Sequence, residues 1–180
     1  MPADDTVFRR VTESDAEARC AAINTKHVSA GLFIEVPVTL ADTRAWCNRV
    51  QTDPTRRDFC IEQDGQPVSF GGLVNIHARH GTAELYVFTI PGSRRRGHGR
   101  HLTSLLLDIA TLELNLRKVF LYVSATNEAA IELYGSLGFL LEGTLRSHAW
   151  FRGAYRDRHI YAMFIDKHQA DPSRLYGAMR

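Results

Sequence analysis

The chain has 180 residues, of which 44% are hydrophobic and 23% are charged, and its formal net charge is +2. This composition is typical of a globular protein with one substantial core, and the small net charge gives the surface as a whole no bias toward nucleic acid or anionic membranes. No apolar run reaches the roughly 18 residues of a membrane span, the amino terminus lacks the apolar stretch of a signal peptide, and three cysteines without metal-site spacing indicate reduced thiols. We therefore expect a cytoplasmic protein with no metal, one domain over residues 1–166, and a polar, loosely held tail over 167–180.

The first part of the chain predicts two helices between short strands. A strand over Val7–Val11 is followed by a helix over 14–27, which Thr12 and Asp15 would cap. Thr39, with an acidic residue three positions later, predicts a second helix over 40–51. The apolar stretch between the two helices, 28–38, is expected to be a mobile connection.

The middle of the chain predicts a hairpin and a long strand. Strands over 59–63 and 68–77 flank the turn sequence Asp-Gly-Gln-Pro at 64–67, and a third strand covers 82–90. Leucine and isoleucine then recur at helical spacing over 99–114, which predicts an amphipathic helix.

The last part of the chain returns to strands. The sequence KVFLYVS at 118–124 is short, apolar and β-rich, as expected of a buried strand. A helix over 127–137 follows it and ends at Gly138, and strands over 140–150 and 155–164 flank a turn at Arg152-Gly153. Strand–helix–strand units of this kind predict an α/β fold with a partly parallel sheet and helices on both faces.

A basic, glycine-containing loop joins the strand over 82–90 to the helix that follows. Residues 90–101 read IPGSRRRGHGRH. Unpaired N–H groups at the start of a helix bind anions, glycine lets the main chain approach a phosphate, and guanidinium groups bind phosphate oxygens in pairs. The loop therefore predicts a pyrophosphate site. A solvated basic turn and a nucleic-acid patch are the alternatives, although the loop lacks the interleaved aromatic residues of the latter.

The loop does not fit the pattern of a nucleotide-hydrolysing enzyme or that of a dinucleotide-binding protein. Arg100 and His101 follow Gly99 where an ATP-type loop needs lysine and a hydroxyl residue, and only two glycines stand where the dinucleotide fingerprint has three.

A second motif, NEAAIELYGSLGF, runs from Asn127 to Phe139. Asn127, Ile131 and Tyr134 fall on one face of a helix, at spacings of four and three. That helix begins at the carboxyl end of a buried strand, where ligands bind in open α/β sheets.

Together the two motifs resemble those of the GCN5-related N-acetyltransferase (GNAT) superfamily. The stretch Arg94–Gly99 matches that family's Arg/Gln-x-x-Gly-x-Gly/Ala cofactor motif, and the string from Asn127 to Phe139 is similar to its later motif. The following stretch, up to Phe164, is similar to the end of the subgroup that contains spermidine, ribosomal-protein N-terminal and amino-sugar N-acetyltransferases. The resemblance implies a mixed sheet of about seven strands in a single domain, and transfer of an acetyl group from acetyl-coenzyme A to an amine.

The resemblance also implies roles for particular residues. Tyr134 would protonate the departing sulfur, the alternative being an aromatic ring that packs under the turn at Gly138 and Phe139. Glu84 would act as a base through a water, and the alternatives are an anchor for the substrate amine and a solvated strand glutamate. Asn127 would hydrogen-bond the cofactor arm, and the strand over 82–90 would be splayed, with its main chain beside the thioester. The implied cofactor-binding residues are Val87, Phe88, Thr89, Arg94, Arg95, Arg96, Gly97, His98, Gly99, Arg100, Asn127 and Ala130.

The acceptor is less defined than the cofactor. Glu35 and Glu84 could hold a cationic amine, and Trp150 lies in the final hairpin near the expected acceptor site. A primary amine on a small molecule, such as an amino sugar, amino acid, polyamine or antibiotic, is the favoured acceptor. A protein N-terminus, a noncatalytic acyl-coenzyme A sensor and a nucleic-acid-binding module are the alternatives, and the subgroup allows a homodimer through the last strands.

Overall fold

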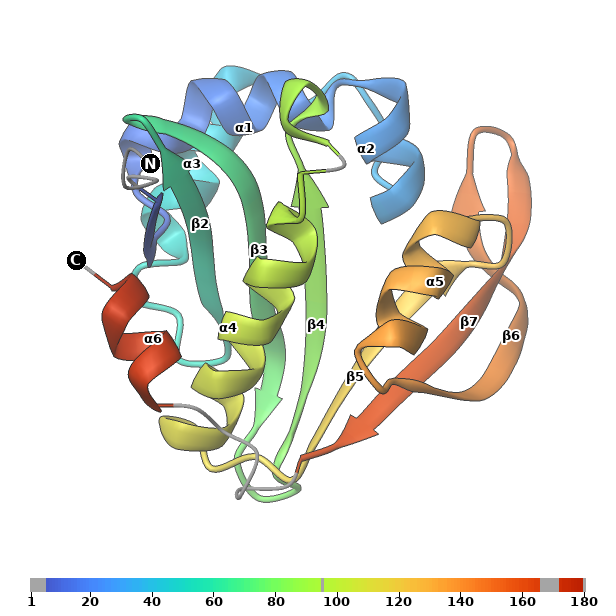
Figure 1. Ribbon diagram of the computed structural model, residues 1–180. Helices are drawn as coiled ribbons and strands as arrows, with labels where there is room; N and C mark the ends of the chain where they lie inside the picture. Colours follow the sequence, from blue (N-terminus) through green and yellow to red (C-terminus); the bar gives the residue numbers. More distant parts are fainter. Residues whose placement is uncertain (1–5, 95, 166–171, 180) are drawn as a thin grey trace.

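In the computed structural model, which describes residues 6–94, 96–165 and 172–179, the strands form one mixed sheet. The seven strands lie in the order β1-β2-β3-β4-β5-β7-β6 (Figure 1). All neighbouring strands are antiparallel except β4 and β5, which are parallel. The strands are β1 (Thr6–Arg10), β2 (Arg57–Gln63), β3 (Gln66–His77), β4 (Thr82–Thr89), β5 (Lys118–Ser124), β6 (Leu140–Phe151) and β7 (Ala154–Phe164).

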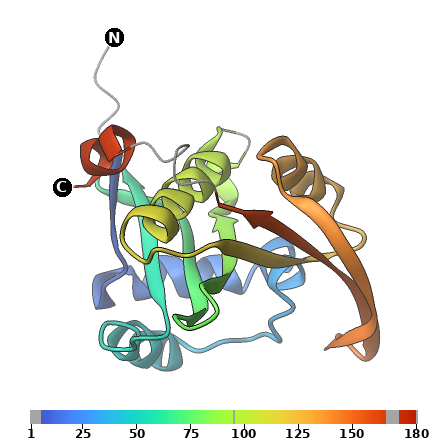
Figure 2. The same cartoon turned by 90° about the horizontal axis from the view of Figure 1, so that it is seen from below.

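Helices cover both faces of the sheet, as the sequence predicts. One face carries α1 (Ala16–Ile23), α2 (Lys26–Leu32) and α3 (Leu40–Arg49), and the other carries α4 (His98–Leu112), α5 (Glu128–Ser136) and α6 (Pro172–Ala178) (Figure 2). No helix among residues 6–94, 96–165 and 172–179 is long and apolar enough to cross a membrane.

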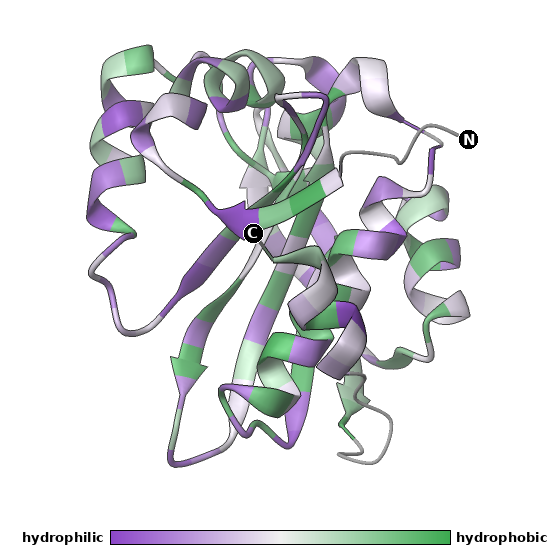
Figure 3. Ribbon diagram, turned by 60° about the vertical axis from the view of Figure 1, so that its left-hand side comes forward, coloured by the Kyte–Doolittle hydropathy of each residue, from purple (hydrophilic) through white to green (hydrophobic). Residues whose placement is uncertain are grey.

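Alternation along the strands divides the core into two clusters, one on each face. In β5, Val119, Leu121 and Val123 are buried toward α4, whereas Phe120 and Tyr122 point to the opposite face. The same alternation appears as bands of hydrophobic and hydrophilic colour along the strands in Figure 3. Because side chains alternate in this way, residues on β4, β5 and β7 can be assigned to a face from their register alone.

The sheet opens between its two parallel strands. β4 pairs with β5 only from Thr82 to Glu84, opposite Lys118 to Phe120. Beyond Glu84 the two strands diverge, so that the carboxyl half of β4 has no partner on that side (Figure 1). The divergence confirms the expected splayed strand, and it leaves the main chain of residues 85–89 available to a ligand on its β5 side.

The first predicted helix is divided in two. α1 ends at Asn24, whose side-chain amide donates to the carbonyl of Val38 and accepts from its N–H, both at 2.9 Å. Such side-chain bonds to a distant main chain compete with continuation of a helix. Thr25 is extended, and α2 begins after it, so part of the expected mobile connection over 28–38 is helical.

The expectation of a loosely held tail is wrong for the described part of it. Residues 172–178 form α6, in which Leu175 is 0% exposed, and Met179 forms a β-bridge with Phe8. The Arg174 guanidinium makes two hydrogen bonds of 2.5 Å to Asp108 of α4. The mostly polar composition of the tail did not indicate that Leu175 would be buried or that Arg174 would pair with Asp108. These two contacts hold α6 against the rest of the protein. Residues 167–171 and 180 of the predicted tail lie outside the described residues.

Candidate active site

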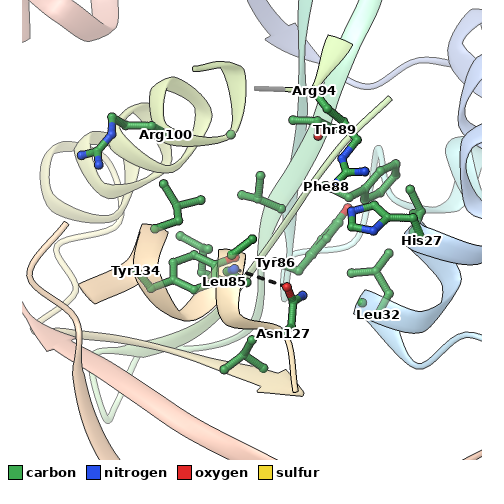
Figure 4. Close-up of a pocket in the computed structure, with 18 of the residues that line it drawn as sticks. His27, Leu32, Leu85, Tyr86, Phe88, Thr89, Arg94, Arg100, Asn127 and Tyr134 are labelled. Atoms are coloured by element: carbon green, nitrogen blue, oxygen red, sulfur yellow. Dashed lines mark hydrogen bonds between the residues drawn. The ribbon is translucent and has the colours of Figure 1, made fainter. Parts of the chain in front are cut away.

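A cavity of about 390 Å³ lies where β4 and β5 diverge. Its walls come from α2 on one side, from α5 on the other and from the start of α4 at one end, with β4 between them (Figure 4). A volume of this size is in the range of small-molecule sites in proteins. The cavity thus joins the two motifs that the sequence places far apart.

The amino end of α4 forms the basic end of the cavity. Gly97 is the N-cap of α4 and has φ +85°, a left-handed conformation that glycine adopts without the strain other residues would incur. No atom lies within 4 Å of the position that a Cβ would take there, so the main chain is open to a ligand. Arg94 and Arg100 line the cavity at this end. Unpaired N–H groups, a helix dipole and two guanidinium groups make this end suited to a phosphate anion.

Most residues of the predicted cofactor set lie on the cavity wall. Those that line it are Val87, Phe88, Thr89, Arg94, Gly97, Gly99, Arg100, Asn127 and Ala130. Arg96 and His98 belong to the same loop and first helical turn but do not line the cavity. Arg95 lies outside the described residues.

Asn127 and Arg100 each make a hydrogen bond at the cavity wall. The Asn127 side chain caps α5 by accepting a hydrogen bond of 3.3 Å from the N–H of Ala130 (Figure 4). Arg100 of α4 donates to the hydroxyl of Ser136 of α5. The bond from Arg100 to Ser136 joins α5 to the start of α4, whereas the Asn127 cap lies within α5 and orders its first turn.

Tyr134 lines the cavity from α5 and is 6% exposed. Its ring meets Phe139 edge to face, and burial raises the pKa of its hydroxyl to about 12. Among the described residues the hydroxyl has no hydrogen-bond partner. The residue therefore combines a packing role with a phenol that stays protonated and can donate to a ligand.

Glu84 does not line the cavity. It is the last residue of β4 paired with β5, and its carboxylate accepts a hydrogen bond of 2.9 Å from the amide of Asn75. Its side chain lies on the face of Phe120 and Tyr122, opposite the neighbouring Leu85. Its role as a base or amine anchor remains a prediction.

Glu35 and Trp150 lie around the turn between β6 and β7, not on the cavity wall. Glu35 accepts a hydrogen bond of 2.9 Å from the N–H of Arg152 in that turn. Trp150 is 55% exposed and packs edge to face with Tyr155. The Glu35 carboxylate therefore connects the loop after α2 to the final hairpin, and its substrate-binding role stays a prediction.

Sequence reasoning did not identify His27, Leu32, Tyr86 and Tyr122, which also line the cavity. Burial and the nearby Arg94 lower the pKa of His27, which favours its neutral form. Tyr86 is held by a 2.6 Å hydrogen bond from its hydroxyl to the buried carboxylate of Asp58. None of these residues belongs to a local motif. The alternation of β5 places Tyr122 on one face of the sheet but does not show what faces it.

Searches among known proteins give one consistent family. A family model described as Acetyltransferase (GNAT) family matches residues 26–139. The spermidine N(1)-acetyltransferase of Escherichia coli strain K12 is 34% identical over 117 residues, which are 65% of this chain and 62% of that protein. The alignment thus spans less than two thirds of that relative's length. The enzyme of the same name from Vibrio cholerae is 29% identical over 144 residues, 79% of this chain and 82% of the relative.

A solved structure shows the same fold. The crystal structure of spermidine N-acetyltransferase from Vibrio cholerae, described as a complex with CoA and spermine, matches with a TM-score of 0.82. The two share 24% sequence identity, and the match covers 88% of this chain and 95% of that one. With the family model covering more than half of the sequence and the divergent β4–β5 pair in place, the chain belongs to the acetyltransferase (GNAT) family.

Proposed function

We propose that the protein transfers the acetyl group of acetyl-coenzyme A to a primary amine of a small molecule. The observation that supports this most directly is the single cavity in which the amino end of α4 and the phenol of Tyr134 both lie. The pyrophosphate of acetyl-coenzyme A would lie against Gly97, Gly99 and the guanidinium groups of Arg94 and Arg100. Its pantetheine arm would follow residues 87–89 toward Tyr134.

The residues present fit this cofactor. The main chain at Gly97 is open, and the β4 main chain has no strand partner beyond Glu84. The unpaired N–H groups of β4 can donate to the thioester carbonyl, as donors in an oxyanion hole do. Gly97 would therefore bind the anionic end of an extended ligand, and the unpaired part of β4 would bind its other end.

The reaction needs one proton donor and one proton acceptor. The amine nitrogen forms a bond to the thioester carbon, the carbon–sulfur bond breaks, and the departing thiolate receives a proton. Tyr134 would donate it, and the burial that raises the pKa of the phenol also raises that of a thiol leaving in the same place. The proton lost by the attacking amine passes to water or, through water, to Glu84. No covalent acyl-enzyme is required.

The relatives support the reaction class. Proteins named as spermidine acetyltransferases align over most of this chain, and an amine acceptor is common to them. A protein N-terminus is the second acceptor class to test. A noncatalytic sensor would bind the thioester without consuming it. The exposed apolar residues of β6 and β7, which include Leu140, Leu141 and Phe164, are compatible with a homodimer through this edge.

The test combines binding and product formation. We expect acetyl-coenzyme A to raise the melting temperature in a concentration-dependent way, and an amine panel with mass-spectrometric detection to yield an N-acetylated product. Binding without any product would favour the sensor. Salt-dependent binding of DNA or RNA, with no stabilisation by acetyl-coenzyme A, would instead assign the basic loop to nucleic acid.

A further inference from the structure

Arg158 lies beside the cavity, on the face of the sheet opposite α4 and α5. It pairs with Ser124 at the end of β5, so its side chain is on the face of Phe120 and Tyr122. Its guanidinium carbon is 4.3 Å from the centre of the Tyr122 ring and 5.3 Å from that of Phe33, which follows α2. Since Tyr122 lines the cavity, Arg158 stands directly behind a cavity wall on the α2 side.

The guanidinium of Arg158 has no acidic partner among the described residues. Its Nε is buried without a hydrogen-bond acceptor, and no carboxylate oxygen of the described chain lies within 4.0 Å of it. Burial lowers the pKa of Arg158, and the charge of Glu84, which the strand register puts on the same face, partly opposes this effect. A partly buried arginine without an acceptor is costly unless an anion supplies one.

The other charged groups nearby are already engaged or carry the same sign. The Arg152 guanidinium lies beside α2, 3.4 Å from the hydroxyl of Ser29. The Glu35 carboxylate accepts its hydrogen bond from the main-chain N–H of Arg152. Asp157 accepts a hydrogen bond from the Ser147 N–H in the neighbouring strand. His148 packs on Tyr122 and would add positive charge when protonated. Among the described carboxylates, Glu84 is the one whose charge acts on Arg158, and no guanidinium or ammonium group of the described chain lies within 4.0 Å of Glu84.

We infer that the acceptor is a zwitterion, whose amine lies toward Glu84 and whose carboxylate or phosphate is bound by Arg158. The inference rests on the proposed acetyl transfer. A guanidinium binds both kinds of oxyanion through two parallel hydrogen bonds, and Tyr122 beneath it restricts its orientation. A polycation such as spermidine would place an ammonium group against a guanidinium that no carboxylate of the described chain pairs with directly, which disfavours it. The acceptor class of this chain therefore differs from the one in its relatives' names.

Matched acceptors separate the charge of the substrate from its size. An amino acid with a terminal carboxylate, such as 4-aminobutyrate, is compared with its amide, which has nearly the same size. Aminoethyl phosphate is compared with ethanolamine, which lacks the phosphate group, and serves to tell phosphate from carboxylate. Spermidine is the polycationic member. Values of kcat/KM are corrected for the fraction of unprotonated amine, because the neighbouring group changes that fraction. We expect at least one anionic member to be preferred by about 10- to 100-fold over its neutral partner.

Variants assign that preference to Arg158. In Arg158→Gln, the ratio of kcat/KM for the anionic acceptor to that for its neutral partner should fall toward one, mainly because KM for the anionic acceptor rises. Arg158→Lys should keep part of this preference because the charge remains. Arg79→Gln is the matched control, since it removes the same charge from the exposed turn between β3 and β4. Melting temperatures with and without acetyl-coenzyme A show whether each variant folds and binds the cofactor.

Each outcome decides the question. A preference that disappears in Arg158→Gln and persists in Arg79→Gln supports the zwitterionic acceptor, and the preferred anion tells carboxylate from phosphate. Preference for spermidine or for the neutral partners overturns the inference and leaves acetyl transfer intact, as does a preference that Arg158→Gln does not alter. Absence of both cofactor stabilisation and product with every amine overturns the proposed function together with the inference.

Discussion

Tyr134 and Phe139 meet edge to face, with ring centroids 5.6 Å apart and planes at 64°. The contact places the Tyr134 ring in the core while the same residue lines the cavity. A phenylalanine at position 134 would keep the ring contact and lose only the hydroxyl. The packing role and the proposed proton-donor role of Tyr134 can therefore be separated by a single substitution.

We expect Tyr134→Phe to lower kcat by about 100-fold, the usual contribution of general acid catalysis. The affinity for acetyl-coenzyme A, measured by calorimetry, and the melting temperature should stay close to those of the wild type. Because burial raises the Tyr134 pKa to about 12, the phenol stays protonated, and we expect no decrease of wild-type kcat from this residue up to about pH 10. An unchanged kcat in the variant would remove Tyr134 from the mechanism.

Gly97→Glu should abolish binding of acetyl-coenzyme A, because it places a carboxylate where the pyrophosphate is expected. The matched control is Gly65→Glu in the turn between β2 and β3. Gly65 also has a positive φ, of 74°, and no atom lies within 4 Å of its Cβ position, so both variants share the strain and the added charge. Thermal-shift titration should show stabilisation by the cofactor in Gly65→Glu only. Retained binding in Gly97→Glu would place the cofactor elsewhere.

Asp15 makes the stability of the fold depend on pH in the acidic range. Burial would raise its pKa, but two hydrogen bonds from Arg9 at 2.8 Å and one from the Thr12 N–H outweigh that effect and hold the pKa below its usual value. A carboxylate with a lowered folded-state pKa stabilises the protein fully above its unfolded-state pKa, near 4, and that stability is lost as the pH falls through the folded-state value.

Asp15→Asn should therefore lower the free energy of unfolding by about 3 kcal/mol at pH 7, the usual cost of removing one partner of a buried pair. The difference from the wild type should stay constant down to about pH 5 and shrink below pH 4. Urea unfolding at several pH values measures this. Glu17→Gln, which breaks the exposed pair with Arg44, is the control and should cost less than about 1 kcal/mol. A pH-independent difference for Asp15→Asn would contradict the assignment.

Leu175→Ala should destabilise the protein by about 2–4 kcal/mol, because it removes a fully buried side chain from the contact of α6 with the core. Tyr176→Ala, at the next position and 64% exposed, should change the free energy of unfolding by less than about 0.5 kcal/mol. Chemical denaturation of both variants tests whether α6 is part of the cooperative fold. Equal stabilities would show that it is not.

Local signals in the sequence predicted many of the helices and strands. The Thr39 cap of α3, with the Asp42 N–H bonded to its hydroxyl at 3.0 Å, and the apolar periodicity of α4 both predicted helices that are present. The paired motifs predicted which helices meet at the cavity. The helix predictions succeeded because each depends on residues within one element, whereas the meeting of the two motifs followed from the resemblance to a known family.

Long-range contacts explain what the sequence did not reveal. The break between α1 and α2 depends on hydrogen bonds between Asn24 and Val38, 14 residues later, and the docking of α6 depends on Arg174 reaching Asp108. The position of Arg158 could not be predicted either, because the residues near it in the chain do not show that Tyr122 and Phe33 lie beside it. Such contacts form only after the strands take their order in the sheet.

The divergence of β4 and β5 opens the sheet itself rather than a groove on one of its sides. A carrier that enters along α4 and α5 and an acceptor that enters past α2 would meet in the plane of the strands from opposite directions. Neither would have to leave before the other arrives, so the proposed transfer would allow either order of loading. A single inhibitor that mimics both reactants would have to pass between these two strands, in the part of β4 that β5 leaves unpaired.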